Sequence, residues 1–389
     1  MNPKPLASII INNYNYGRFL KEAIESALNQ TYSHVEVIVV DDGSVDISRQ
    51  VIESYGSRVF SVFKENGGQG SAFNAGFRLS RGEILCFLDA DDFLLPNAMG
   101  EIARAFSENS PVKVQWRLNV IDASGRKTGS LMPPQMPPEG DFKSKIIQEG
   151  PFYDWQLTPP SSGNAYARSF IEKVFPMPEP SFRNGADVYL TVLAPVFGLL
   201  KTIDPPLGCY RSHGSNNYWS KSLDDARIQN YQARFEANSQ ALHHFLKQTG
   251  IGVDPETWKQ TNINYVWPSR LLQAKEDIAQ RIPAGETYIL VNEDEWGNDG
   301  EAVSGRHALH FTELDGAYGG PPADDDAAIR EFERLRSRGA RYMVFWYTAF
   351  WWLVEYAGFR SYLNEKFSTI LNNDRLIIFD LKSSLSIKA

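Results

Sequence analysis

The sequence predicts an α/β protein, with a mainly parallel, doubly wound sheet and a smaller α/β domain at the C-terminal end. Short apolar runs rich in β-branched residues alternate with helical patterns over the first hundred of the 389 residues. A second alternation, with no motif shared with the first, occupies the last hundred residues. Hydrophobic residues make up 42% of the chain, which is enough for buried cores.

The N-terminal elements follow one another in a regular order. The apolar residues between positions 19 and 28 recur at helical spacing and form one stripe, as in a helix that covers a sheet. A glycine-rich turn precedes a further helix, which we expect to stop at Gly82. Pro96 is expected to open the next one. Predicted strands span residues 7–11, 35–40, 59–63 and 83–88, and predicted helices span 19–28, 51–55 and 70–82.

The remaining chain suggests three domains with boundaries at 1–220, 221–282 and 283–389. After a strand at 112–121, proline-rich segments predict loops that shape a pocket over the sheet. Residues 221–282 are polar and helical in pattern, and are interpreted as a connector. The last domain is predicted to hold strands at 287–292, 341–347 and 376–381, with helices at 325–338 and from 349.

Charge and hydropathy exclude some classes of function. The net charge is −8 and there is no stripe of lysine and arginine, so we expect no nucleic-acid partner. The most apolar stretch, residues 342–354, is shorter than the about 20 residues of a membrane-spanning helix. The N-terminal segment turns polar too quickly for a signal peptide. We therefore expect a cytoplasmic protein without a transmembrane segment, and peripheral association with a membrane stays open.

Polar clusters follow three of the four N-terminal strands. They are Asn-Asn-Tyr-Asn at 12–15, Asp-Asp-Gly-Ser at 41–44 and Asp-Ala-Asp-Asp at 89–92. In open parallel sheets, ligands bind beyond the carboxyl ends of the strands. Each cluster taken singly is also typical of a turn or a helix cap. Their coincidence at three strand ends of one sheet favours a binding site.

The carboxylates of these clusters indicate a divalent metal. Close carboxylates repel one another unless a cation or a proton lies between them. Metal sites of this kind use one or two carboxylates together with waters and substrate phosphates. With an aromatic ring for base stacking, the set describes a nucleotide site. A simple acid/base pair is the weaker alternative, because it leaves Tyr14, Asp41 and Asp42 unused.

Two segments carry a resemblance to a known family: IIINNYNYGRFLKEAIESALNQTYSHVEVIVVDDGS (9–44) and ENGGQGSAFNAGFRLSRGEILCFLDADD (65–92). Over about residues 5–220 the chain resembles glycosyltransferase family 2, the inverting nucleotide-sugar transferases with the Rossmann-like A-type fold. The C-terminal domain resembles an accessory domain appended to some bacterial transferases of this type. The family's order and spacing of the acidic elements are kept.

The resemblance implies a role for each matching residue on the donor side. Asp89-Ala90-Asp91 corresponds to the family's Asp-x-Asp element, and Asp92 is interpreted as a cap of the following helix. The implied donor contacts are Asn12 and Tyr14 to the nucleobase, Asp42 with Asp41 to its edge, Asp89 to the ribose and sugar, Asn74 beside the donor and Arg211 to the leaving diphosphate. Asp91 and His213 would bind Mn²⁺ or Mg²⁺.

On the acceptor side, Asp187 precedes an apolar helix where the family has its catalytic aspartate. Ala186 stands where a glutamate is usual, so the assignment depends on one carboxylate. The alternative is that Asp187 is only a helix N-cap.

The resemblance implies a metal-dependent, hexosyltransferase-type enzyme that moves a sugar from a nucleoside-diphosphate donor, a UDP-sugar, to an acceptor hydroxyl with inversion. A glycan or lipid-linked acceptor in cell-surface polysaccharide synthesis is expected. Ala186 keeps open a nucleotide-sugar sensor without catalysis. Nucleotidyl transfer is also open, although residues 13–18 are not the basic glycine-rich loop that such enzymes normally have.

Two features of the C-terminal domain are expected to be structural. The acidic residues 293–295 are interpreted as a solvated loop, and the acids near 324–326 as favourable charges at a helix N-terminus. The aromatic run at 345–352 is expected to be core, with a carbohydrate platform as the alternative.

Overall fold

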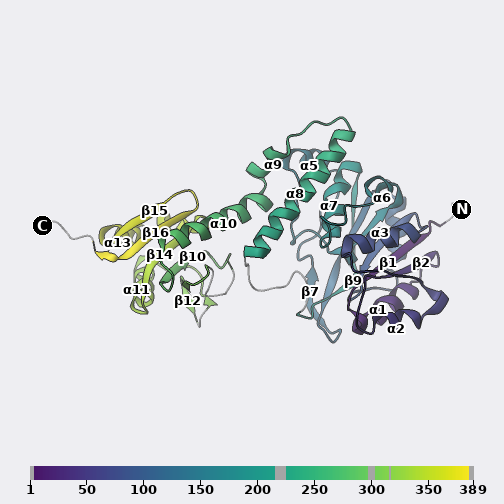
Figure 1. The fold of residues 1–389 in the computed structure, drawn as a ribbon, viewed down its shortest axis with the longest axis horizontal. Helices are drawn as coiled ribbons and strands as arrows, with labels where there is room; N and C mark the ends of the chain where they lie inside the picture. Colours follow the sequence, from purple (N-terminus) through teal and green to yellow (C-terminus); the bar gives the residue numbers. More distant parts are fainter. Residues whose placement is uncertain (1–3, 215–224, 297–302, 315–316, 385–389) are drawn as a thin grey trace. The chain divides into compact units, whose positions relative to one another are not determined.

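The computed structural model describes residues 4–214, 225–296, 303–314 and 317–384 (Figure 1). The chain forms two compact units. The first comprises Met1–Asn216 and Ala233–Tyr265, and the second comprises Asn217–Gln232 and Val266–Ala389.

The first unit is built on a mixed sheet with strand order β3-β2-β1-β4-β8-β6-β9-β5, and β7 pairs with β6. Strand β1 lies parallel to both β2 and β4, and β2 lies parallel to β3, so these four form one parallel part, while β6 and β9 form a second parallel pair. Strand β8 runs antiparallel to its neighbours β4 and β6. The strands are β1 (Ala7–Asn13), β2 (Val35–Asp41), β3 (Phe60–Phe63), β4 (Ile84–Asp89), β5 (Phe93–Leu94), β6 (Lys113–Ile121), β7 (Lys127–Met132), β8 (Asn164–Ala167) and β9 (Leu200–Arg211).

Both faces of this sheet are buried, as a doubly wound fold requires. Along β1, Ile10 packs into one apolar cluster, while Ile9 and Ile11 pack into another, because successive side chains of a strand point to opposite faces. Helices α1 and α4 contribute to the second cluster, and α3, α6, α7 and α8 to the first. The helices are α1 (Gly17–Leu28), α2 (Ser48–Glu53), α3 (Gln69–Leu79), α4 (Ala98–Ser107), α5 (Lys143–Glu149), α6 (Arg168–Val174), α7 (Ala186–Phe197), α8 (Asp225–Gln248) and α9 (Pro255–Thr261).

The predicted α/β fold and most strand positions are confirmed, but several helix boundaries differ, and α2 spans Ser48–Glu53 rather than 51–55. Helix α3 ends at Leu79 rather than Gly82, because Ser80 already has an extended backbone. Helix α4 starts after Asn97, which is its N-cap residue. The short strand β5 lies between Asp92 and that helix, so Asp92 is not its cap.

Residues 221–282, predicted as a connector, are helical over most of their described length, and the two units share them. Phe235, Leu242 and Leu246 of α8 belong to the core of the first unit. Helix α10 (Ile263–Arg281) places Leu271, Ala274 and Ile278 in the core of the second. The predicted domain boundaries stay predictions.

The second unit contains a five-stranded sheet of order β11-β10-β14-β16-β15, in agreement with the predicted C-terminal α/β domain. Strand β10 lies parallel to β11 and β14, and β16 is antiparallel to β14 and β15. Apolar clusters cover both faces. The elements are β10 (Thr287–Val291), β11 (His307–His310), β12 (Glu313–Leu314), β13 (Ala317–Tyr318), α11 (Asp325–Ser337), β14 (Ala340–Trp346), α12 (Trp352–Glu355), α13 (Ala357–Lys366), β15 (Phe367–Asn372) and β16 (Leu376–Ser384).

The acidic loop after β10 is not simply solvated, contrary to the prediction. Glu293 Oε1 accepts hydrogen bonds from the indole N–H groups of Trp351 and Trp352, at 2.8 and 3.1 Å. Glu295 Oε2 accepts from those of Trp346 and Trp267, at 2.8 and 3.2 Å. These carboxylates tie the loop to the surrounding tryptophans.

The aromatic run agrees with the predicted core for two of its tryptophans. Trp346 and Trp352 are fully buried, whereas Trp351 is 42% exposed. Across the described residues, no helix combines the length and the apolar character needed to span a bilayer.

Candidate functional site

The three polar clusters meet at one edge of the first sheet, as predicted. In the strand registers, Asn12 lies opposite Asp89 and Asn13 lies opposite Asp41. Asn12 Nδ2 donates to Asp89 Oδ1 at 2.8 Å, and Asn13 Nδ2 donates to Asp41 Oδ1 at 2.8 Å. The amides of β1 therefore hold the carboxylates of both flanking strands.

Asp42 organises the glycine-rich turn. Lys64 Nζ donates to Asp42 Oδ1 at 2.5 Å, and Asn66 Nδ2 donates to Oδ2 at 3.1 Å. The backbone N–H groups of Gly67 and Gly68 also donate to this carboxylate, at 3.0 and 2.6 Å. Both oxygens thus have donors from the turn. The expected contact of Asp42 with a base edge stays a prediction.

Tyr14 lies at the exposed side of this edge. Its side chain is 47% exposed and so is accessible to a ligand. The adjacent Asn15 has a left-handed backbone (φ 61°), which its contacts with the second strand end hold in place. Asn15 N donates to Ser44 Oγ at 2.8 Å, and Val45 N donates to Asn15 Oδ1 at 2.8 Å.

The acidic cluster at the end of β4 is largely withdrawn from water. Burial and the nearby charge of Asp91 raise the pKa of Asp89 to about 7. Burial, followed by the charges of Asp91 and Asp89, raises the pKa of Asp92 well above its usual value. Within the described residues, Asp92 Oδ2 has no hydrogen-bond partner, while its Oδ1 accepts from Arg211 N at 2.9 Å. The cluster has the mutual repulsion that a bound cation would relieve.

The two predicted metal ligands lie together. His213 Nε2 is 3.0 Å from Asp91 Oδ2, and the His213 side chain is fully buried. Its ring packs against those of Tyr16 and Phe19, with centroids 5.4 and 5.2 Å apart. Burial and the charge of Asp91 raise the pKa of Tyr16 to about 12, so its hydroxyl stays protonated at neutral pH.

These residues fit a metal that takes most of its ligands from elsewhere. In the part of the chain that the structure describes, no group of three or more His, Cys, Asp and Glu side chains is arranged to enclose an ion. One carboxylate and one imidazole beside further buried acids match a site completed by phosphate oxygens and water.

Arg211, predicted to contact a diphosphate, supports the acidic cluster from within. Its side chain is 3% exposed, and Nε donates to the backbone oxygen of Asp91 at 2.9 Å. Nη2 pairs with the carboxylate of Glu22, and the guanidinium lies 4.7 Å from the ring centroid of Phe19. These contacts fix the loop that carries Asp91. Contact with a diphosphate stays a prediction.

Asn74, predicted to lie beside the donor, is 2% exposed and anchors a distant loop. Its Nδ2 donates to Met177 O and to Glu179 Oε1, both at 3.0 Å, and its Oδ1 accepts from Met177 N at 3.0 Å. The amide is fully engaged by this loop, which gives Asn74 a structural role. Its donor contact stays a prediction.

Asp187 is not an N-cap residue. Helix α7 begins at Ala186, and its N-cap is Gly185 in a left-handed conformation (φ 82°) that glycine adopts without strain. Asp187 is 7% exposed, and its Oδ1 has no hydrogen-bond partner among the described residues. Burial raises its pKa. The charge of Asp187 also contributes to the raised pKa of Asp89, so the two carboxylates are close enough to interact.

Gln69 joins the two halves of the site and was not among the predicted site residues. Its Oε1 accepts from the backbone N–H groups of Gly185 and Ala186, both at 3.0 Å, and so caps α7. Its Nε2 donates to Ser161 Oγ at 3.0 Å, and the Ser161 hydroxyl in turn acts to lower the pKa of Asp89. No local sequence pattern predicts a contact between residues 69 and 185.

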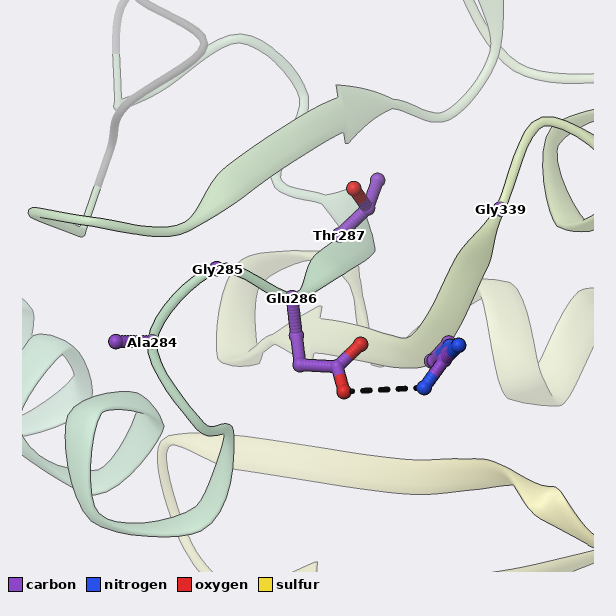
Figure 2. A pocket seen from close by; sticks show the side chains of 6 residues that line it. Ala284, Gly285, Glu286, Thr287 and Gly339 are labelled. Carbon is purple, nitrogen blue, oxygen red and sulfur yellow. Dashed lines mark hydrogen bonds and ion pairs between the residues drawn. The ribbon is translucent and has the colours of Figure 1, made fainter.

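The second unit contains a cavity of about 380 Å³ (Figure 2). It is lined by Ala284, Gly285, Glu286, Thr287, Gly339 and Arg341, at the start of β10 and β14. Glu286 pairs with Arg341 at 3.3 Å inside it. None of the predicted site residues belongs to this cavity.

Sequence comparison identifies the family. Residues 8–174 match the family described as Glycosyl transferase family 2. An uncharacterised glycosyltransferase of Nostoc sp. is 38% identical over 252 residues, which are 63% of this chain and 77% of the Nostoc protein. The chain belongs to glycosyl transferase family 2.

Other relatives match the chain over shorter stretches or at lower identity. An uncharacterised glycosyltransferase of Rickettsia typhi is 39% identical over 34% of this chain and 42% of its own length. The putative glycosyltransferase EpsH of Bacillus subtilis is 26% identical over 63% of this chain and 73% of its own. Among solved structures, S. aureus TarS 1-349 aligns with a TM-score of 0.47 at 16% identity, over 72% of this chain and 75% of that one.

Proposed function

We propose that this glycosyltransferase moves a sugar from a nucleoside-diphosphate donor, a UDP-sugar, to an acceptor hydroxyl with inversion at the anomeric carbon. The observation that carries the proposal is the meeting of the strand-end cluster with Asp187. A buried carboxylate with an unpartnered oxygen lies within electrostatic reach of Asp89, and Gln69 and Ser161 link the two. A donor side and an acceptor side therefore share one edge of the sheet.

The donor is held by residues at the carboxyl ends of β1, β2 and β4. Tyr14 stacks on the base, while Asn12 orients the carboxylate of Asp89 toward the ribose and the sugar. Asp91 and His213 would hold Mn²⁺ or Mg²⁺, which supplies charge neutralisation for the departing diphosphate when bound. Arg211 keeps the backbone of Asp91 in place for this purpose.

Asp187 is the general base. Its free oxygen takes the proton of the acceptor hydroxyl, and the resulting nucleophile attacks the anomeric carbon from the face opposite the leaving group. A pKa raised by burial makes the ionised carboxylate a stronger base than an exposed aspartate. The products are the glycosylated acceptor, the nucleoside diphosphate and a protonated Asp187.

The acceptor is a hydroxyl of a glycan or of a lipid-linked glycan, in the assembly of a cell-surface polysaccharide. A hexose is the transferred sugar, and the protein meets its acceptor as a cytoplasmic enzyme at the membrane surface. Relatives in Bacillus subtilis are described as glycosyltransferases, which is compatible with such a role and does not specify it.

Donor selection by thermal shift, followed by turnover, tests the proposal. The full chain is screened against a panel of nucleotide sugars with Mn²⁺, because only a ligand that binds the folded state raises its midpoint. The donor so chosen should release its nucleoside diphosphate in the presence of oligosaccharide acceptors. Stabilisation without any release would instead support the nucleotide-sugar sensor.

A further inference from the structure

Arg234 of α8 lies against the first turn of α7. A side-chain Cβ placed on Gly185 would come within 3.2 Å of Arg234 Nε and 3.3 Å of its Cζ. Helix α8 is anchored there by Phe235, the residue after Arg234, which is buried in the core of the first unit. A guanidinium from a helix far along the chain is thus held beside the residue that precedes Ala186 and Asp187.

A cation at this position is unfavourable for the helix alone. The N-terminus of a helix carries a partial positive charge, so a guanidinium there needs an anionic partner. Asp187 is the acidic residue of the first turn of α7. Its Oδ1 has no hydrogen-bond partner in the described part of the chain. The carboxylate of Asp187 offers such an anionic group on the same turn.

The electrostatics agree with this placement. Burial, the largest influence, raises the pKa of Asp187, and the charge of Arg234 is the first to oppose it. Lys113 also acts on Asp187, from β6, where it is fully buried and donates to Thr191 Oγ1 at 3.2 Å. Burial lowers the pKa of Lys113 to about 7, so its charge is only partly present at neutral pH. The guanidinium is always charged.

We propose that Arg234 is a positioning residue for the transfer reaction, whose guanidinium keeps Asp187 ionised and turned toward the acceptor hydroxyl. The proposal rests on the assignment of Asp187 as the base. With Arg234 in place, Asp187 is ready to accept a proton at neutral pH despite its burial. Helix α8 is then part of the catalytic machinery rather than a connector.

The test is the pH profile of kcat/KM for three substitutions on α8. Arg234→Met removes the charge, Arg234→Lys keeps it on a different side chain, and Lys247→Met removes an exposed cation near the other end of the helix as the control. The readout is nucleoside diphosphate released from the donor that the thermal-shift screen selects. Thermal unfolding checks that each variant is folded, and Arg234→Gln replaces Arg234→Met if the latter is not.

Loss of the guanidinium should raise the pKa of Asp187, so the acid limb of the profile should move upward by roughly one to two pH units. The loss of activity should then be about tenfold or more on the acid side and should shrink as the pH rises. Lysine should restore much of the wild-type profile, and Lys247→Met should leave it unchanged. A merely structural role would lower activity equally at every pH.

Two outcomes would overturn the inference: a wild-type profile in the folded Arg234→Met variant, or a loss that is independent of pH and not restored by lysine. Asp187→Asn separates this inference from the proposed function. If Asp187→Asn is inactive while the profile of Arg234→Met is unchanged, only the role of Arg234 fails. If Asp187→Asn keeps its activity, the assignment of the base fails.

Discussion

Both units carry acidic residues after parallel strands, but the hydrogen bonding of the carboxylates differs between the two units. After β10, the half-buried carboxylates of Glu293 and Glu295 each accept two indole hydrogen bonds. In the first unit, Asp92, which follows β4, and Asp187, at the start of α7, are buried with an oxygen that has no partner among the described residues. A buried carboxylate oxygen that the fold leaves without a partner needs an explanation, such as a bound ion or a catalytic role.

Carboxylates with and without hydrogen-bond partners for both oxygens also occur together within the first unit. Asp42 follows a strand as Asp89 does, yet the glycine-rich turn supplies donors to both of its oxygens. Position at a strand end therefore does not decide function by itself. The hydrogen-bond partners and charged neighbours of each carboxylate bear on it as well, and substitutions can test this in both units.

Among the substitutions that test this comparison between the two units, Asp91→Ala is expected to have the largest effect. Loss of the carboxylate removes a metal ligand, and metal charge stabilisation is worth several kcal/mol, so turnover should fall by about a hundredfold or more. The fold should persist, because the substitution also relieves repulsion among buried carboxylates. Nucleoside diphosphate release is measured, with the exposed Glu108→Ala as control. Undiminished wild-type activity in excess EDTA would contradict the metal assignment.

An intermediate effect, on stability and not on catalysis, is expected for Glu295→Ala. The substitution leaves the indole N–H groups of Trp346 and Trp267 without their acceptor, at a cost of about 1–3 kcal/mol in the free energy of unfolding. Denaturant unfolding followed by tryptophan fluorescence measures it, with the exposed Glu365→Ala as control. Unaltered stability would show that the acidic loop is solvated after all.

The smallest effect is expected for Gln69→Ala. Removing the cap of α7 should cost about 1 kcal/mol of stability, as for other helix caps. Because the cap also sets the first turn that carries Asp187, kcat should fall while KM for the donor changes little. The exposed Gln50→Ala serves as control. Wild-type values of both kcat and stability would remove Gln69 from the site.

Sequence patterns were sufficient for the parts of the fold that depend on local periodicity. Apolar runs of the right length predicted β1, β2 and β4, and the parallel arrangement then brought Asn12 opposite Asp89. The polar clusters could be recognised because amides and carboxylates rarely follow three neighbouring strands by chance.

The remainder depends on contacts between distant segments, which periodicity does not encode. Gln69 reaches α7 across 116 residues, and Arg234 reaches the same turn from a helix that looked like a connector. The prediction that Asp92 caps a helix was wrong, because its carboxylate accepts from the backbone N–H of Arg211, 119 residues away. The prediction that the acidic loop of the second unit is solvated was also wrong, since its tryptophan partners come from other elements of that unit.

Asp187→Asn is the most direct test of the central claim that an unsatisfied buried carboxylate at the start of α7 is the base. The variant should bind the donor and Mn²⁺ with wild-type affinity in the thermal-shift assay. Its release of nucleoside diphosphate in the presence of acceptor should fall by about 10²- to 10⁴-fold, the usual contribution of general base catalysis. Glu108→Gln is the matched control. Release at a near wild-type rate in Asp187→Asn would contradict the claim.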